Sequence, residues 1–395
     1  MDTRISPVSA AVAAGLSGLA ALVVPHPAAA QKAELHVEVA THTLPGMGGM
    51  GALGRLAGNM AGGTAAYGQA RHPGMPGRYL DIALDNTRKP GSPATQAIPK
   101  DLRLGKALDL LPPEQRVATA PGVSDGSIPG LAQDSNYEVR FYWGCGEEAR
   151  KGQPRKFTVT VRNGRQSMSG SAPQPRAVPK LGVESDPRYA LWPNQSSRKT
   201  VPGKASLVGA HSVTGDGLSR PIDFRIDPAQ DFMPELELRS GGEAAQGISL
   251  DWNPVDGARA YFIHAMGMDG DVVVMWSSSE DGYAGPELMS YLPGNTISQW
   301  LGKGTLLSPG TRRCAIPKEI FAAHPMVQMI AYGDTRTIEG DEWRVHLRNK
   351  STAMLMGAGM GAGMSAEPVE DSAKDSAKDS ARDAAKGLLR GLLRR

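Results

Sequence analysis

The sequence predicts a mainly β protein with two β-sandwich units and a C-terminal helical tail. Three observations predict this class. The 395 residues include 48 Gly and 30 Pro, about a fifth of the chain, which is typical of many turns. Apolar residues alternate with polar ones in several short runs, as in half-buried strands. Apolar patterns with a helical period are scarce before the C-terminus.

Residues 1–30 are predicted to be an export signal. Arg4 supplies a basic start, Val8–Val24 is apolar apart from Ser and Gly, and Ala28–Ala30 offers a small-residue cleavage site before Gln31. The alternative is an uncleaved membrane anchor, which a 17-residue apolar run nearly allows. We expect cleavage, and therefore a periplasmic or extracellular location for the mature protein.

The overall charge excludes one class of partner. With 43 Lys and Arg against 40 Asp and Glu, the net charge is only +3. Such a balance provides no general attraction to nucleic acid, and an exported protein rarely meets it. We expect no nucleic-acid partner.

Two cysteines, Cys145 and Cys314, form a candidate disulfide, because the export signal leads to an oxidising compartment. Two buried free thiols are the alternative, since the sequence does not report the distance between them. The chain has no C-x-x-C spacing, which argues against thiol exchange and against a cysteine zinc site.

The first sandwich unit is predicted to span residues 31–240. It contains a Gly/Met-rich insert at 46–63, interpreted as a mobile loop, and a Pro- and Ser-rich stretch at Ser167–Pro202. Alternating patterns predict its strands at Ala33–Leu44, Arg78–Leu84, Asn136–Tyr142, Lys156–Val161, Ala205–Ala210, Ile222–Ile226 and Glu235–Leu238.

The second unit is predicted to span residues 241–350, after a Gly-rich linker at Arg239–Gly247. Ile248–Met266 reads as two strands joined by a Pro-Val-Asp-Gly turn, with Trp252 on the first strand and Tyr261 on the second. This order resembles the second and third strands of a fibronectin type III module. The resemblance implies an immunoglobulin- or fibronectin-like sandwich with both aromatic rings in its core.

Later segments complete this second unit. Met326–Tyr332 and Glu342–Leu347 are predicted to form its closing hairpin, and Ile320–Ala323 is predicted to be helical. The mature chain also resembles a group of exported proteobacterial proteins in the phrases YWGCGE (142–147), KGQPRKF (151–157) and WNPVDGARAY (252–261). That resemblance implies a location outside the cytoplasm and no particular activity.

Residues 351–395 are predicted to be a Gly/Met linker and an amphipathic helical tail. Three DSAK-like repeats precede a leucine-rich, basic end. The residues expected to contact an anionic membrane surface or an envelope protein are Leu388, Leu389, Leu392, Leu393, Arg390 and Arg394. A solvated, partly helical tail is the alternative.

No catalytic, cofactor-binding or metal-ligating residues are assigned from motifs. Gly46–Gly51 fits G-x-G-x-x-G, but nearby glycines would break the helix that must follow it. Gly122–Gly126 fits G-x-S-x-G, but Pro121 and Pro129 bracket it. His36 and His42 share a predicted strand region without a metal-binding spacing. We expect no cofactor.

The sequence favours an exported, non-enzymatic binding or structural protein of the cell envelope. The alternative is a periplasmic hydrolase or metal-binding protein whose site is built from dispersed loop residues. A pocket with convergent polar groups would favour the alternative, whereas a flat apolar patch would favour the first interpretation.

Overall fold

The computed structural model describes residues 32–45, 65–71, 75–113, 128, 131, 134–163, 165–172, 177–179, 181–282 and 284–357. The predicted export signal, the Gly/Met-rich insert and the helical tail lie outside these residues, and so do both glycine motifs. Within the described part, the chain is mainly β, with one short α-helix, which confirms the mainly β part of the predicted class.

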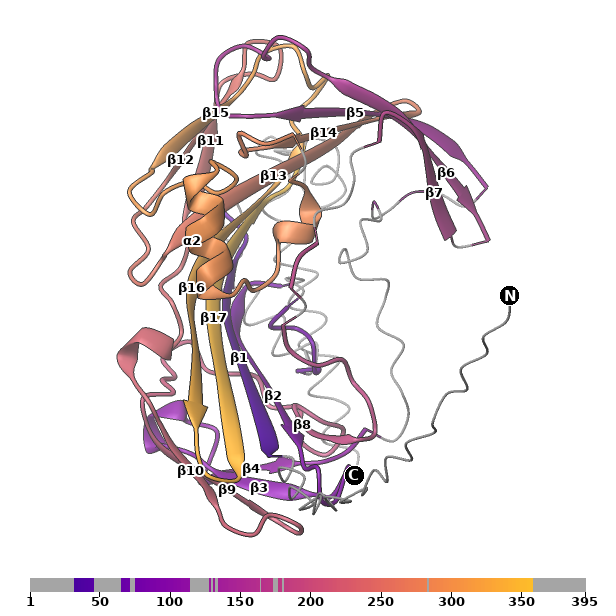
Figure 1. The fold of residues 1–395 in the computed structure, drawn as a ribbon. Coiled ribbons are helices and arrows are strands. Elements are labelled where there is room, and N and C mark those ends of the chain that lie inside the picture. Colours follow the sequence, from indigo (N-terminus) through magenta and orange to yellow (C-terminus); the bar gives the residue numbers. More distant parts are fainter. Residues whose placement is uncertain are drawn as a thin grey trace, which may run out of the picture. The chain divides into compact units, whose positions relative to one another are not determined.

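Seventeen strands form three sheets (Figure 1). The strands are β1 (Ala33–Thr43), β2 (Gly77–Asp85), β3 (Ala94–Ala97), β4 (Ala107–Leu110), β5 (Asn136–Trp143), β6 (Arg155–Arg162), β7 (Arg165–Gly170), β8 (Tyr189–Trp192), β9 (Gly209–Gly215), β10 (Ile222–Ile226), β11 (Leu238–Gly241), β12 (Ile248–Trp252), β13 (Ala260–Asp269), β14 (Val272–Ser277), β15 (Arg313–Ile316), β16 (Met326–Glu339) and β17 (Trp343–Leu355). The helix α2 spans Gly294–Gly302, and short 3-10 turns span Lys100–Leu102, Pro228–Gln230 and Pro286–Leu288.

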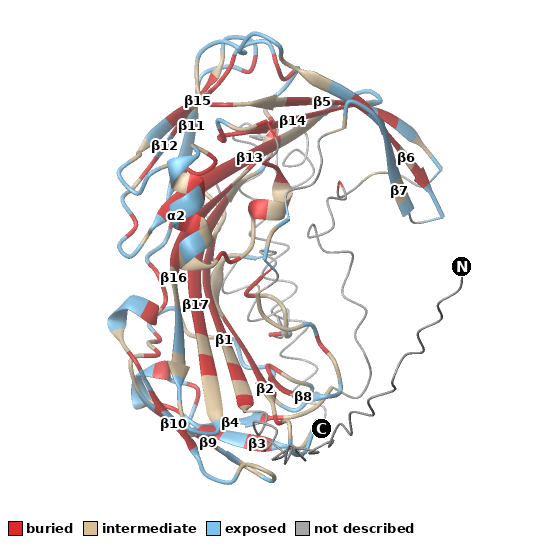
Figure 2. Cartoon of the chain, in the orientation of Figure 1, coloured by how far each residue is buried: buried red, intermediate tan, exposed pale blue. Residues whose placement is uncertain are grey.

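The largest sheet has ten strands in the order β7-β6-β5-β14-β13-β16-β17-β1-β2-β8. Its neighbours are antiparallel except for the pairs β1–β17 and β5–β14, which are parallel. Buried residues run along the central stretch of β16, β17 and β1, so this part of the sheet is covered on both faces (Figure 2).

A first hydrophobic core lies between part of this sheet and the four-stranded sheet β10-β9-β3-β4. The large sheet contributes β17, β1, β2 and β8. Along β1, alternation sends Leu35, Val37 and Val39 into this core. The small sheet contributes residues such as Val213 and Phe224, and the two layers together form a sandwich-like unit.

A second core lies between the three-stranded sheet β11-β12-β15 and the strands β14, β13, β16 and β17 of the large sheet. Trp252 on β12 and Tyr261 on β13 meet edge to face there, with ring centroids 5.7 Å apart. The Tyr261 hydroxyl also accepts a hydrogen bond from the backbone N–H of Val255 (3.2 Å). Both rings thus fill the core between sheets, as predicted.

The two cysteines are joined. Cys145 follows β5, and Cys314 on β15 is paired with it in a disulfide whose Cα atoms are 5.3 Å apart. Backbone bonds reinforce this junction, since the N–H of Gly146 donates to the carbonyl of Ala315 (3.0 Å). The bridge therefore connects the end of a strand in the large sheet to the small sheet β11-β12-β15.

Several sequence predictions need correction. Ile320–Ala323 forms turns instead of a helix. The strand predicted at Ala205–Ala210 begins only at Gly209 and continues to Gly215. Leu238–Gly241, expected to end one strand and enter a linker, pairs with β12 as an edge strand. The small, polar residues of this segment did not predict a strand. At the edge of a sheet, backbone hydrogen bonds can hold a strand whose side chains show no apolar pattern.

The expected boundary at residue 240 falls within β11. Strands from both sides of it belong to the ten-stranded sheet, because β1 pairs with β17 along eleven residue pairs, from Ala33↔Trp343 to Thr43↔Ala353. No helix among the described residues is long and apolar enough to cross a membrane.

Candidate functional site

A row of charged residues lies on the face of the large sheet opposite the first core. On β1, the alternation that buries Leu35 and Val37 on one face sends Glu38 to the other. Strand pairing places Glu38 beside Arg348 of β17 on one side and Asp81 of β2 on the other. Three ionisable side chains from three strands therefore stand next to one another.

Glu38 is the centre of a buried ion network. Its Oε2 atom accepts a hydrogen bond from Nε of Arg71 (2.6 Å), and its Oε1 accepts one from Nη1 of Arg348 (3.1 Å). The exposed fractions of these side chains are only 2% for Glu38, 8% for Arg71 and 7% for Arg348. Such burial is tolerable because each charge has a close, hydrogen-bonded partner. Burial opposes the charge of Arg71, but Glu38, Tyr67 and Glu184 together outweigh this effect and raise the pKa of Arg71.

Two further buried groups have pKa values shifted towards neutrality. Burial, followed by the neighbouring charge of Glu38, raises the pKa of Asp81 to about 8. Burial lowers the pKa of Lys350 to about 7. The Lys350 ammonium group donates to the carbonyl of Arg71 (2.9 Å) and lies 4.7 Å from the centre of the Tyr291 ring. Low solvation disfavours the charged form of both groups.

This network holds the short segment Ala65–Arg71 against the sheet. Asp81 accepts a hydrogen bond from the N–H of Ala70 (2.9 Å), and the hydroxyl of Tyr291 bridges the carbonyls of Val39 (3.0 Å) and Ala70 (3.3 Å). Together with the Arg71–Glu38 pair, these bonds fix the segment from three sides. A connecting segment held this way is a rigid wall for whatever lies beside it.

A second segment, around Gly182, contacts the network because its backbone passes close to Glu38. Gly182 has φ +79°, and a Cβ atom at this position would lie 1.6 Å from Oε1 of Glu38, so only glycine fits. The next residue, Val183, accepts hydrogen bonds at its carbonyl from the Tyr67 hydroxyl (2.9 Å) and from the Arg71 guanidinium. Glu184 then pairs with Arg71 at 3.3 Å.

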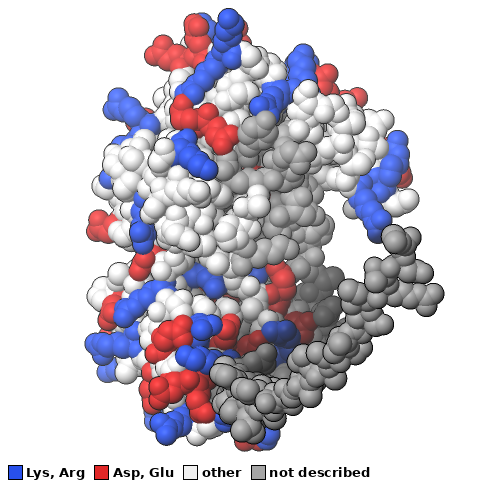
Figure 3. Space-filling view, in the orientation of Figure 1, with Lys and Arg blue, Asp and Glu red and all other residues white. Residues whose placement is uncertain are grey.

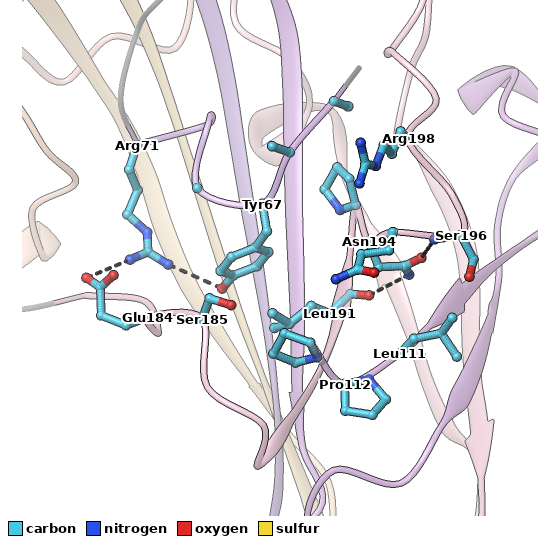
Figure 4. A pocket seen from close by; sticks show the side chains of 16 residues that line it. Tyr67, Arg71, Leu111, Pro112, Glu184, Ser185, Leu191, Asn194, Ser196 and Arg198 are labelled. Atoms are coloured by element: carbon cyan, nitrogen blue, oxygen red, sulfur yellow. Dashed lines mark hydrogen bonds and ion pairs between the residues drawn. The ribbon is translucent and has the colours of Figure 1, made fainter. Parts of the chain in front are cut away.

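Beside this network lies a pocket of about 360 Å³ (Figure 4). One wall is the 65–71 segment with Glu184 and Ser185, and the other is the loop that follows β8. In the view of Figure 4, Tyr67 stands between the Arg71–Glu184 pair and the Asn194–Ser196 loop. Apolar side chains form much of the remaining surface: Leu111, Pro112, Pro113, Leu191 and Pro193.

Asn194 shapes the loop wall. Its Nδ2 donates to the carbonyls of Asp109 (2.7 Å) and Leu191 (2.8 Å), while its Oδ1 accepts from the N–H groups of Ser196 (3.1 Å) and Ser197 (3.0 Å). The amide is thus occupied in maintaining the loop. This geometry presents Ser196 and Arg198 at the pocket rim.

The charged residues at the pocket rim differ in whether they form an ion pair. The Glu184 carboxylate, whose side chain is 66% exposed, is paired with Arg71. Arg198 is exposed and makes no ion pair with the described residues. Among the described residues, Arg198 is therefore a cation at the rim whose charge is not balanced by an ion pair.

The described residues that line the pocket include two hydroxyl side chains, Ser185 and Ser196, and no histidine or cysteine. The Tyr67 hydroxyl is hydrogen-bonded within the protein, and burial raises its pKa well above the usual range. It is therefore a poor general acid or base near neutral pH.

Sequence reasoning missed this site. Of the residues singled out, Cys145 and Cys314 are brought together by their disulfide, whereas Leu388, Leu389, Leu392, Leu393, Arg390 and Arg394 lie outside the described residues. The sequence feature that could have indicated the site is the presence of charged residues within or directly after predicted strands. Glu38 occupies a polar position in the alternating run Ala33–Leu44, and Arg348 and Lys350 follow the predicted strand Glu342–Leu347. Charged residues in such places are buried only when a partner is near.

Comparison with known proteins adds no further constraint, because no family model, no curated protein and no solved structure matches the chain.

Proposed function

We propose that the chain is an exported, non-enzymatic binding protein of the cell envelope whose pocket takes a small, mainly apolar molecule carrying an anionic group. The observation that carries this proposal is the pocket itself. Its volume of about 360 Å³ lies within the ordinary range for small-molecule sites, roughly 300–1,000 Å³. Its walls combine apolar side chains with a few fixed polar groups, as such sites usually do.

Rigidity of the walls supports binding. Pro112, Pro113 and Pro193 have restricted backbones, and the 65–71 segment is held by the buried ion network. A preformed pocket loses little conformational entropy when a ligand enters, so more of the contact energy becomes affinity.

Charge supports an anionic group on the ligand. Arg198 is the cation at the rim without an ion pair in the described part of the chain, whereas Arg71 is neutralised by Glu38 and Glu184. Elsewhere on the face drawn in Figure 3, basic and acidic side chains lie intermixed, so attraction to the ligand would be local to the rim.

The disulfide and the signal-like N-terminal sequence support the proposed location. A bridge between Cys145 and Cys314 persists in oxidising compartments, such as the periplasm and the extracellular space. Residues 1–30 carry the basic, apolar and small-residue regions of an export signal.

The strand order supports a fibronectin type III-like second unit. Of its seven consecutive strands, the first, second and fifth (β11, β12, β15) form one sheet. The third, fourth, sixth and seventh (β13, β14, β16, β17) are neighbours in the other sheet. This is the division expected from the family that the WNPVDGARAY segment resembles, and such modules commonly present loops for contact with other molecules.

The C-terminal tail is proposed as a second contact region, for an anionic membrane surface or an envelope protein. Its four leucines and nearby arginines support this role. A peptide of residues 371–395 should gain helical circular dichroism on anionic vesicles and lose it as salt is raised. An unchanged spectrum would leave a solvated tail or a protein contact.

A fluorescent probe tests the pocket. We expect the sulfonate dye 1-anilinonaphthalene-8-sulfonate to bind the full chain at one saturable site. Ala66→Trp, which fills the pocket, should abolish this binding, whereas Ala210→Trp, at an exposed position on β9, should not. Equal binding by both variants would contradict the proposal.

The charge argument has its own test. Arg198→Gln should weaken binding of the sulfonate dye about tenfold, the usual size of one lost charged hydrogen bond. The same variant should leave binding of the neutral dye N-phenyl-1-naphthylamine unchanged. Arg225→Gln, at an exposed position on β10, is the matched control and should change neither affinity.

A further inference from the structure

A second cluster of side chains lies along the same strand pair, nearer its start. Because β1 and β17 are parallel and in register, His36 is paired directly with His346. Glu34 lies two residues before His36 and therefore on the same face of the sheet. Two imidazoles and one carboxylate thus converge from two strands.

The three groups are at coordinating distance from one another. Oε2 of Glu34 lies 3.8 Å from Nε2 of His36 and 3.6 Å from Nε2 of His346. One ligand atom from each residue lies within 4.8 Å of the others, and the two imidazole rings are stacked with centroids 4.7 Å apart. Metal–ligand bonds of about 2.0–2.1 Å place neighbouring ligand atoms of a tetrahedral zinc site about 3.3–3.5 Å apart. The cluster is therefore close to this spacing before any ion enters.

Neighbouring residues orient two of the three groups. Nη1 of Arg344 donates to Oε1 of Glu34 (3.1 Å), which leaves Oε2 directed at the histidines. Oγ1 of Thr337 lies 3.3 Å from Nδ1 of His346 and can accept a hydrogen bond from an Nδ1–H group, in which case Nε2 keeps its lone pair. Supporting contacts of this kind are typical around metal ligands.

Besides Arg344, which is hydrogen-bonded to Glu34, Arg348 places a second positive charge beside the cluster. Its Nη2 lies 3.5 Å from Nδ1 of His36, at the limit of a hydrogen bond, while its Nη1 donates to Glu38 at 3.1 Å. The shorter contact with a carboxylate is the stronger one. Arg348 is therefore held by Glu38 and does not depend on His36 for a partner.

We propose that Glu34, His36 and His346 bind a divalent transition-metal ion, with Zn²⁺ as the best match. Imidazole nitrogen with carboxylate oxygen is a donor set that suits zinc, and three protein ligands leave a fourth position for water. The exposed fractions of the side chains, 35% for Glu34, 12% for His36 and 20% for His346, allow entry from solvent. This site is separate from the apolar pocket and does not depend on it.

Calorimetric titration of the metal-free full chain with zinc chloride tests the site. One Zn²⁺ per chain is expected, and His36→Gln or His346→Gln should weaken binding at least tenfold. Thr337→Val, which removes a supporting contact, should weaken it about tenfold. Magnesium chloride should give no binding, because Mg²⁺ prefers oxygen ligands alone.

His324→Gln is the matched control. His324 also lies 3.8 Å from a carboxylate, that of Glu243, but belongs to no described cluster of three ligand residues. Its substitution should leave zinc affinity unchanged. The proposal is overturned if the wild type binds no zinc, or if the His36 and His346 variants bind as tightly as the control.

Folding is checked separately by the melting temperature of each variant without metal. Should a histidine variant fail to fold, Glu34→Gln provides the test, because Glu34 is the most exposed of the three ligands. This substitution should also lower zinc affinity at least tenfold, and unchanged affinity in a folded Glu34→Gln protein would exclude the carboxylate as a ligand.

Discussion

The two sandwich-like parts of the large sheet are held together by different means. The part facing β11-β12-β15 has an apolar core with the Trp252–Tyr261 pair, and a disulfide joins its two layers. The part facing β10-β9-β3-β4 also has an apolar core, but its outer face carries the buried network around Glu38. Burial of apolar surface stabilises the fold without requiring a particular orientation of the side chains. An ion pair requires a defined geometry and therefore holds its two segments in fixed positions. The pocket lies beside the second arrangement.

The largest expected effect concerns the disulfide. Replacing Cys145 and Cys314 by Ser should lower the free energy of unfolding by about 4–5 kcal/mol, because the bridge closes a loop between residues 169 positions apart. Urea denaturation of the oxidised and the substituted protein measures this difference. Binding of the sulfonate dye should survive in the folded fraction, since the pocket belongs to the other part of the molecule. Equal stability of the two proteins would show that the bridge adds no constraint.

The next effect concerns the ion network. Glu38→Gln should cost about 3–5 kcal/mol of stability, because Arg71 and Arg348 would remain buried without their shared carboxylate. Urea denaturation provides the measurement, and the 65–71 wall should loosen, so the folded variant should also bind the dye more weakly.

Leu35→Ala is the comparison variant for Glu38→Gln. It opens a cavity in the first core on the other face of the same strand and should cost about 2–5 kcal/mol. Its dye affinity should nevertheless be that of the wild type, because the charged face is untouched. If both variants weaken binding equally, the network has no special role in positioning the wall.

A smaller effect depends on pH. Burial lowers the pKa of His264 on β13 to about 4, and its Nε2 has no hydrogen-bond partner among the described residues. Between pH 4 and 6.5 the unfolded chain binds this proton and the folded chain does not, so stability falls as the pH is lowered through this range. The contribution is at most about 3 kcal/mol.

Removal of the imidazole isolates this contribution. The stability difference between wild type and His264→Leu should change between pH 7 and pH 4 in favour of the variant, as measured by urea denaturation at each pH. Parallel pH profiles for His264→Leu and wild type would contradict the assignment.

The smallest effect is expected for the Gly/Met-rich insert. Residues 46–63 lie outside the described residues, and their sequence has neither a strand period nor a sustained apolar face. Deleting them should leave the melting temperature nearly unchanged, because Ala70 and Arg71 are anchored by Asp81 and Glu38 on their own. A large loss of stability would show that the insert belongs to a core.

The amino-acid pattern predicts correctly those strands in which apolar and polar residues clearly alternate. Ala33–Thr43, Gly77–Asp85 and Arg155–Arg162 agree with the predicted runs within a residue or so, because one apolar face is enough to specify a half-buried strand. The resemblance to a fibronectin type III module predicted that Trp252 and Tyr261 lie in a core, where both rings are found. The four-residue strands β3, β4, β8 and β15 were missed, since two inward side chains are too few to establish a period.

The pairing of segments that are distant in the chain could not be predicted from the sequence and is seen only in the folded protein. His36 and His346 are 310 residues apart in the chain, and so are Glu38 and Arg348. Their meeting depends on the parallel register of β1 with β17, and a shift of one residue would send each side chain to the opposite face. The pairing of Cys145 with Cys314 is likewise seen only in the structure, because the sequence allowed either a disulfide or two free thiols. The sequence supplies the groups that can pair or coordinate, but long-range register decides which of them meet.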